Sequence, residues 1–204
     1  MRRLLDRALR FAEWGSKRAA LAGGVLMLAA AVLVSVDVVL RKLASVTLGG
    51  ADELSGYALA IGSTWSFAFV LLNRGNVRID VLYQHLPRAV AAGFDLLAIG
   101  SRVVFVSLVA WHGGGVLAQT WQIGARSNSA LAVPLVVPQA LWWLGYLWFV
   151  ACGAALLLRS ALSFAGGDWS AVNRLIGARG VRDDAADELH NAHSALHSTG
   201  SRGA

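Results

Sequence analysis

Four long apolar stretches dominate the pattern of hydrophobic and polar positions along the chain. They cover residues 19–40, 54–72, 90–111 and 138–158. A bilayer core about 30 Å thick requires roughly 20 apolar residues for one helical crossing, and each stretch meets that length. Because backbone groups in lipid must pair within the protein, the pattern predicts an all-α membrane protein with four transmembrane helices, in a membrane domain over 19–162.

A different pattern precedes the first span, where apolar and basic residues alternate at helical spacing. The apolar positions are Leu4, Leu5, Ala8, Phe11 and Ala12, and the basic positions on the other face are Arg3, Arg7, Arg10 and Lys17. A basic amphipathic helix is typical of segments that lie in the membrane interface. The sequence therefore predicts an interfacial helix over 1–18. The charged segment is too long for a secretory signal, so the span after it is expected to remain as an anchor.

The connections between the spans differ in character. Residues 73–89 form a loop in which Gly75 permits a tight turn and Pro87 begins the next helix. Residues 112–137 open with three glycines soon after the third span, which indicates a flexible segment. From residue 163 the chain turns polar, and this tail over 163–204 is expected to be cytoplasmic and disordered at its end.

Fourteen of the 18 Lys and Arg residues lie on one side of the four predicted spans. They fall before residue 19, in the 73–89 loop and after the fourth span, whereas only Arg41, Lys42 and Arg126 lie on the opposite side. Because cytoplasmic loops carry the basic excess, the pattern predicts a bacterial inner membrane protein with both termini in the cytoplasm (N-in/C-in). The net charge of +6 thus reports topology, and no binding of nucleic acid is expected.

Composition argues against most catalytic and cofactor chemistry. Hydrophobic residues make up 56% of the 204 residues and charged residues 15%, well below the roughly 25% of soluble domains. The single cysteine, Cys152, leaves no partner for a disulfide. Of five histidines only His112 touches a predicted span, so facing haem ligands are missing, and there is no phosphate-binding glycine loop. We therefore expect no enzyme activity, no cofactor and no metal.

Three ionisable residues fall inside the predicted spans, where charges are costly and therefore indicate function. Asp37 precedes Arg41 by four residues, in the favourable order for a helical ion pair. Arg102 is expected within about 2 Å of the membrane midplane at 1.5 Å per residue. Its side chain can reach toward Asp37 or toward Asp95, two turns earlier on its own helix. The expected roles are an interhelical ion pair, a contact with another subunit, or a part in substrate passage.

Other candidate contact residues lie at helix ends and on helix faces. Asp52 and Glu53 start the second span, where carboxylates favour the helix dipole, and Arg126 lies on the same side. Helix capping explains the two acids, and the alternative is a periplasmic docking surface formed by all three residues. Trp142 and Trp143 exceed the needs of an interfacial aromatic belt and are expected at a subunit interface. Small residues whose spacing allows close helix contacts are Gly23, Gly24, Gly56 with Ala60, and Gly62 with Ser66.

Three segments of the chain resemble a known family. The first is Gly50-Ala-Asp-Glu-Leu-Ser55, which enters the second span. The second is Arg74-Gly-Asn-Val-Arg-Ile-Asp-Val-Leu82, with its motif residues Arg74, Gly75, Arg78 and Asp80, and the third is Ser127-Asn-Ser-Ala-Leu131, followed by Pro134 and Pro138. Over roughly residues 15–165 the chain resembles the small membrane subunit, of the DctQ type, of tripartite ATP-independent periplasmic (TRAP) transporters. Asn76 stands where the family commonly has a histidine.

The resemblance implies a role in a three-part importer. In such a system a periplasmic substrate-binding protein captures an organic acid, and a large TRAP membrane subunit moves it with a sodium gradient. This chain would scaffold the large subunit, and its partners would be those two proteins and the lipid bilayer. The alternative is an independent four-helix membrane channel or membrane enzyme. A fourth span that is almost wholly apolar between Gln139 and Arg159 does not favour a channel.

Overall fold

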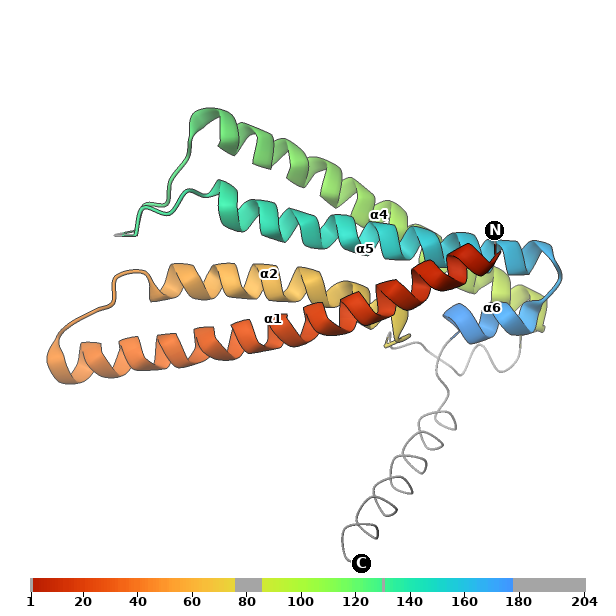
Figure 1. The fold of residues 1–204 in the computed structure, drawn as a ribbon, viewed down its shortest axis with the longest axis horizontal. Helices are drawn as coiled ribbons and strands as arrows, with labels where there is room; N and C mark the ends of the chain where they lie inside the picture. The colour runs from red at the N-terminus through yellow and green to blue at the C-terminus, as the bar shows by residue number, and fades with distance from the viewer. Residues whose placement is uncertain (1, 76–85, 130, 178–204) are drawn as a thin grey trace, which may run out of the picture.

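A computed structural model describes residues 2–75, 86–129 and 131–177 of the chain. Within these residues the protein is helical, and the single isolated β-bridge, between Arg126 and Pro134, forms no strand. The helices are α1 (Arg2–Ala44), α2 (Ala51–Leu72), α4 (Arg88–Ile123), α5 (Val136–Ala165) and α6 (Trp169–Ile176) (Figure 1). The all-helical class predicted from the apolar pattern is confirmed.

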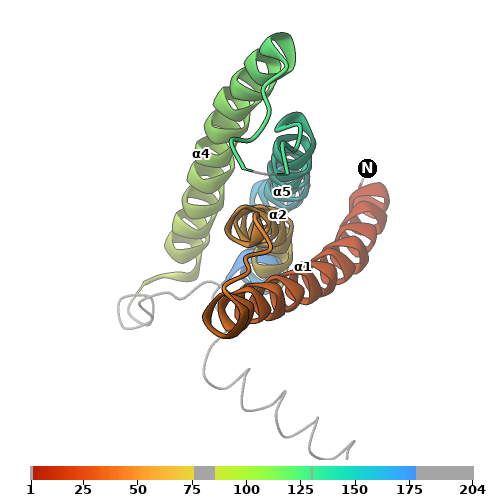
Figure 2. The ribbon, with the colours of Figure 1, turned by 90° about the vertical axis from the view of Figure 1, so that its left-hand side faces the viewer.

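The long helices form two antiparallel pairs that pack side by side. α1 packs on α2, α4 packs on α5, and α2 contacts α5 in the middle, so that α1 and α4 lie on the flanks (Figure 2). We call the end that holds the start of α1, the end of α5 and α6 the proximal end. The distal end consists of the connections 45–50 and 124–135. The two pairs come together at the proximal end and spread apart toward the distal end (Figure 1).

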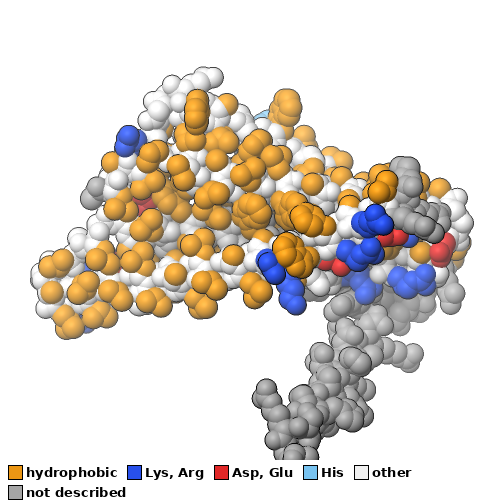
Figure 3. Space-filling view, viewed as in Figure 1, with side chains coloured by type: hydrophobic (Ala, Val, Ile, Leu, Met, Phe, Trp, Pro, Cys, Tyr) orange, Lys and Arg blue, Asp and Glu red, His pale blue; other side chains and the backbone are white. Residues whose placement is uncertain are grey.

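Among the described residues, four helices are long and apolar enough to cross a membrane. They comprise Leu4–Ala44, Ala51–Leu72, Ala89–Ile123 and Val136–Ala165, in agreement with the four predicted spans. In the first of these helices, only 6% of the most apolar segment is buried within the chain. In the second and fourth helices, the buried share of the corresponding segment is 28%. Apolar side chains therefore cover most of the outside of the molecule, as Figure 3 shows for one face. Such a surface requires lipid or another protein around it.

α1 is longer than the predicted first span. It joins the amphipathic segment 1–18 and the span 19–40 in one helix of 43 residues, about 65 Å long, with no break between them. No proline lies in this range to remove a backbone donor and end the helix. Gly23 is accommodated because its backbone lies against Gly62 of α2, where a Cβ atom would meet the Gly62 carbonyl oxygen at 2.9 Å.

α4 continues well past the predicted end of the third span. It runs through the three glycines at 113–115 to Ile123, where a flexible segment was expected, and it ends at Gly124 in the left-handed conformation (φ 61°). The expectation of a flexible segment over 112–137 was wrong for its first half. Glycine lowers helix propensity, yet here Gly113 and Gly114 lie in contact with aromatic rings of α5, and this packing outweighs propensity.

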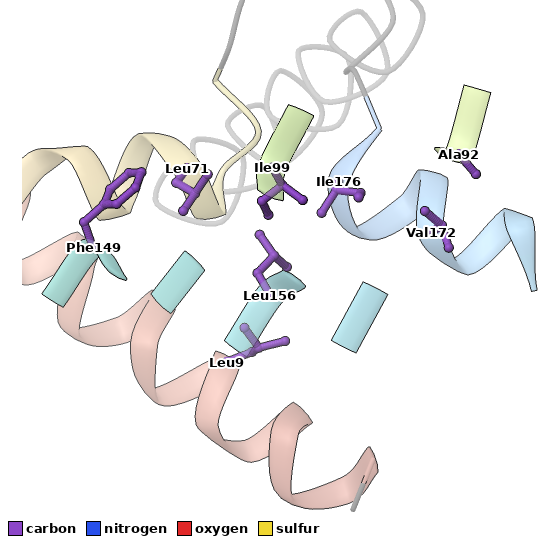
Figure 4. Close-up of a cluster of buried hydrophobic side chains, with 8 residues drawn as sticks. All are labelled: Leu9, Leu71, Ala92, Ile99, Phe149, Leu156, Val172 and Ile176. Carbon is purple, nitrogen blue, oxygen red and sulfur yellow. The ribbon is translucent and has the colours of Figure 1, made fainter. Parts of the chain in front are cut away.

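The largest buried cluster lies at the proximal end and draws on all five helices (Figure 4). Its buried members are Leu9, Leu71, Ala92, Ile99, Phe149, Leu156, Val172 and Ile176. α6 belongs to this cluster, and its start is capped by Asp168, whose carboxylate accepts a hydrogen bond from the Ala171 amide (2.9 Å). The tail expected from residue 163 thus begins with the end of α5 and a packed helix. The end of that tail lies outside the described residues.

Candidate functional site

Asp37 ties the α1–α2 connection to the distal end of α1. The carboxylate is buried and forms an ion pair with Arg41, one turn later on the same helix. It also accepts hydrogen bonds from the Leu48 amide (2.7 Å) and the Thr47 hydroxyl (3.1 Å) in the connection. The predicted pair with Arg41 is confirmed. Because the remaining donors come from the neighbouring loop, the main role of Asp37 is to fix the path of the chain between two helices.

The distal connection 124–135 docks on the start of α2. Tyr57 donates a hydrogen bond to the Glu53 carboxylate, and the hydroxyls of Ser127 and Ser129 lie close to the same carboxylate. Gly50, at φ 154°, lies under Leu131, whose Cδ1 would be 2.4 Å from a Cβ atom at that position. Two of the segments that carry the family resemblance therefore meet in space, although more than 70 residues separate them in the sequence.

The three residues predicted as a docking surface all lie at the distal end. Asp52 is exposed in the first turn of α2, whereas Glu53 is half-buried by the contacts described above. Arg126 donates a hydrogen bond to the Ala132 carbonyl (3.2 Å), which closes the 124–135 connection on itself. Arg126 and Glu53 thus help to shape this connection, and a docking role for the three remains a prediction.

Trp142 and Trp143 pack the start of α5 against the glycines of α4. A Cβ atom at Gly113 would lie 3.2 Å from the Trp142 ring, and one at Gly114 would lie 3.2 Å from Nε1 of Trp143. The Trp143 indole nitrogen donates to the Ala110 carbonyl (2.8 Å), which adds a polar link between the two helices. The two tryptophans therefore hold α4 and α5 together within the chain.

A large apolar groove opens beside this contact, between α4 and α5. It has a volume of about 610 Å³. The lining residues are Ser107, Ala110, Trp111, Gly114, Gly115, Trp143, Leu147 and Val150. Trp111 is 80% exposed, and a Cβ atom at Gly115 would meet nothing within 4 Å, so the described part of the chain leaves the groove unfilled. We refer to this feature as the α4–α5 groove.

Arg102 lies at the proximal end of the bundle. It lines a small pocket with Arg74, the second residue after α2, and with Gly177, which follows α6. Asp37 is bound to Leu48, before the start of α2, and the 22 residues of α2 span about 33 Å. The predicted approach of Arg102 to Asp37 is therefore wrong, because the two residues lie near opposite ends of α2. Asp95 is buried on α4, and its pairing with Arg102 remains a prediction.

The other motif residues fall around the turn after α2. Arg74 adopts a positive φ of 54°, and the Gly75 amide donates to the Val70 carbonyl (3.0 Å), which ends the helix in a tight turn. Arg78 and Asp80 lie outside the described residues. In this segment, as in the 124–135 connection, the geometry of a helix end therefore explains part of the residue pattern.

Several contacts escaped the sequence analysis because their partners are far apart in the chain. Arg159 at the end of α5 binds the Asp6 carboxylate of α1 (2.8 Å), and the Trp148 indole donates to the Ser16 hydroxyl (3.0 Å). Gly145 of α5 lies against Thr64 of α2. A basic residue at the end of an apolar span and a tryptophan within it were visible signals, but neither indicated which helix supplied the partner.

No candidate metal site is found among the residues that the structure describes. They contain no group of three or more His, Cys, Asp or Glu side chains placed to hold a metal ion. The α4–α5 groove is lined by aromatic rings, small residues and aliphatic chains. Such a surface is suited to apolar contacts with a protein or a lipid chain.

The family resemblance is established by a match to a family model. Residues 30–164 of the 204 match the model described as "Tripartite ATP-independent periplasmic transporters, DctQ component". No curated protein and no solved structure matches the chain. The matched region contains α2, α4, nearly all of α5, the α4–α5 groove and the distal connections. With its four helices of membrane-spanning length, the chain belongs to the DctQ family and is a multi-pass membrane component of a TRAP transporter.

Proposed function

We propose that this chain is the small permease subunit that scaffolds the large membrane subunit of a TRAP transporter during sodium-driven, binding-protein-dependent uptake of an organic acid. The observation that carries this proposal is the α4–α5 groove on a member of the DctQ family. Family membership supplies a tripartite system, and the groove supplies a surface on which a second membrane protein can pack.

The shape of the α4–α5 groove suits a transmembrane helix of the large subunit. Helices associate in lipid mainly by van der Waals contact, which small residues strengthen because they let backbones come close. Gly114 and Gly115 supply small residues in the lining, and the exposed ring of Trp111 provides a broad apolar wall beside them.

Two charged groups whose contacts the structure describes suit a scaffold rather than a carrier. A sodium-coupled carrier needs a site that binds ions and substrate and releases them again near the middle of the membrane. Asp37 instead serves the α1–α2 connection, and Arg159 is bound to Asp6 at the proximal end. The independent channel or membrane enzyme is therefore not favoured.

For the topology, we propose that the proximal end faces the cytoplasm of a bacterium and the distal end faces the periplasm. Fourteen basic residues fall before residue 19, in the 73–89 loop or after the fourth span, against three on the opposite side of the spans, which is the asymmetry that sets orientation in inner membranes. A reporter that works only in the cytoplasm should be active when it is fused after Pro87. A reporter that works only in the periplasm should be active when it is fused at Arg126. The opposite pattern of reporter activity would reverse the proposed orientation.

Reconstitution tests the division of labour. Purified alone into liposomes, the chain should not take up an organic acid above the level of empty vesicles. Uptake should appear only when the large membrane subunit, the periplasmic binding protein and an inward sodium gradient are all present. Omitting this chain should reduce uptake at least tenfold if it holds the large subunit in its working shape. Uptake by this chain alone would contradict the scaffold role, and full uptake without it would make the chain dispensable.

A further inference from the structure

The proximal half of α1 carries an exposed face of cations and aromatic rings. Its residues follow each other at steps of one, three and four, so they share one side of the helix. They are Arg7, Arg10, Phe11, Trp14, Lys17 and Arg18, all exposed, and we call them the basic aromatic face. They precede residue 30, where the family match begins. The role of this face is therefore not given by membership of the family.

The opposite side of the same helix is anchored on α5. Leu9, Ala12 and Ser16 are buried, and the Ser16 hydroxyl accepts a hydrogen bond from the Trp148 indole (3.0 Å). The ion pair between Asp6 and Arg159 adds a second link near the start of α1. With one side fixed in this way, α1 cannot rotate about its axis, and the basic aromatic face is held outward.

The position of the face along α1 places it at the edge of the apolar surface. Past Arg18 the same stripe continues with the exposed aliphatic residues Leu21, Val25, Leu28 and Val32. In Figure 3 Lys and Arg side chains likewise gather toward the proximal end, while hydrophobic side chains cover the remainder of α1. A change from aliphatic to basic and aromatic residues on one stripe is typical of the level of lipid headgroups.

The cations of the face are available for a ligand. Within the described residues none of the four makes an ion pair; of the two nearby carboxylates, Asp6 is bound to Arg159, and the exposed Glu13 lies one turn before Lys17 without forming an ion pair with it. The Arg18 guanidinium lies over the Trp14 ring, with Cζ 4.0 Å from the ring centroid. This cation–π contact holds the guanidinium plane against a partly exposed ring and leaves its N–H groups at the edge for an anion. Phe11 stacks on Trp14 from the other direction, with centroids 6.1 Å apart.

We propose that the basic aromatic face binds the phosphate of an anionic phospholipid headgroup, with Lys17 and Arg18 as its principal contacts. The acyl chains would lie along Leu21 and Val25, which continue the same stripe toward the distal end. A lipid fits better than a soluble anion because the cations directly adjoin an apolar surface of acyl-chain character. It fits better than an acidic protein segment because the exposed Phe11 (62%) and Trp14 (55%) require apolar surroundings beside the charges. The proposal does not depend on the role of the chain in transport.

Native mass spectrometry of the full chain in neutral detergent tests this site. The wild-type chain is titrated with phosphatidylglycerol and, separately, with phosphatidylcholine of the same acyl chains. Each basic residue near an anionic surface contributes about 1 kcal/mol, or about fivefold in affinity. We expect the wild type to bind phosphatidylglycerol at least fivefold more tightly than phosphatidylcholine. The double variant Lys17→Gln/Arg18→Gln should lose this preference.

The control is Lys42→Gln, which removes an exposed positive charge near the distal end of α1 and should keep the preference, and it is compared with Lys17→Gln and Arg18→Gln singly, each of which should weaken it. Thermal unfolding of each variant checks that the exposed substitutions leave the fold intact. Equal affinity of the wild type for both lipids would overturn the proposal and leave the face to an acidic protein segment. A preference that survives in the Lys17/Arg18 variant, or disappears equally in the control, would also overturn it. Displacement of the lipid by millimolar glycerol 3-phosphate would identify a soluble-anion site instead.

Discussion

Replacing Gly145 by leucine should strongly destabilise the folded chain. A Cβ atom at this position in α5 would lie 2.6 Å from the Thr64 hydroxyl oxygen, 2.8 Å from its Cβ and 3.1 Å from its carbonyl carbon. Thr64 is itself buried, and part of this obstacle is backbone, so no rotamer change can make room. The substitution therefore has to separate α2 from α5, the contact that joins the two helix pairs.

The separation should also break a specific hydrogen bond nearby. The Trp65 indole donates to the Leu141 carbonyl (2.9 Å), one turn from Gly145, and this distance depends on the close approach of α2 and α5. Overpacking a tight site costs about 1–3 kcal/mol, and the lost hydrogen bond adds about 1 kcal/mol. Against a total stability of about 5–15 kcal/mol, we expect a much lower unfolding temperature and a large fall in monodisperse protein on size exclusion.

Gly24→Leu is the matched control for this experiment. It introduces the same side chain into another membrane helix, at a glycine where a Cβ atom would meet nothing within 4 Å. We expect this variant to unfold at the wild-type temperature or slightly above it, since leucine favours helix more than glycine does. Equal behaviour of the Gly145 and Gly24 variants would show that the α2–α5 contact does not hold the pairs together.

The contrast between Gly23 and Gly24 shows where sequence reasoning reached its limit. Both glycines stood out in the first span, and small-residue spacings in the second span suggested close helix contacts. The structure places Gly23 against Gly62 and leaves Gly24 and Gly56 without a neighbour. A hydrophobic pattern predicts that a helix crosses the membrane. In lipid, however, both the side that faces other helices and the side that faces lipid are apolar, so the pattern does not predict which side of the helix faces its neighbours.

The same limit applies along the helix axis. The third span was predicted from its apolar run, which gave an end at residue 111, and the position of Arg102 near the membrane middle followed from that length. α4 instead spans Arg88–Ile123, and Arg102 lies beside Arg74 at the proximal end. The glycines at 113–115 led to a predicted helix end that was too early. Gly113 and Gly114 pack against Trp142 and Trp143, and helix propensity does not include such a contact with another helix.

The contacts of Asp37 and Glu53 show which side-chain contacts can be predicted from the sequence and which cannot. The spacing of Asp37 and Arg41 was sufficient to predict their ion pair, because i,i+4 contacts are local. The bonds from Thr47 and Leu48 could not be predicted, since they depend on the path of an irregular connection. Near Glu53 the resemblance to a family marked two segments, and the structure supplies a physical reason for both, because they pack on each other.

Filling the α4–α5 groove with a leucine at Gly115 should weaken assembly with the large subunit while sparing the fold. A Cβ atom at Gly115 meets nothing within 4 Å, so the isolated chain should accept the side chain without strain. Helix propensity should even favour the variant by about 1 kcal/mol. A helix that packs in the groove would meet the new side chain directly, at a cost of about 1–3 kcal/mol. Co-purification of the large subunit from membranes should therefore fall about tenfold.

Gly93→Leu separates this effect from a general response to bulk on α4. It makes the same change in the same helix, again where a Cβ atom would meet nothing within 4 Å, but 22 residues or about 33 Å from Gly115. Both variants should have wild-type unfolding temperatures in detergent, and only the Gly115 variant should lose the large subunit and transport in the reconstituted system. If the Gly115 variant retains the large subunit at the wild-type level, the partner packs elsewhere, and the exposed apolar stripe of α1 becomes the next surface to test. If both variants lose it, the interface extends along the length of α4, because two sites so far apart cannot be covered by a helix confined to the groove.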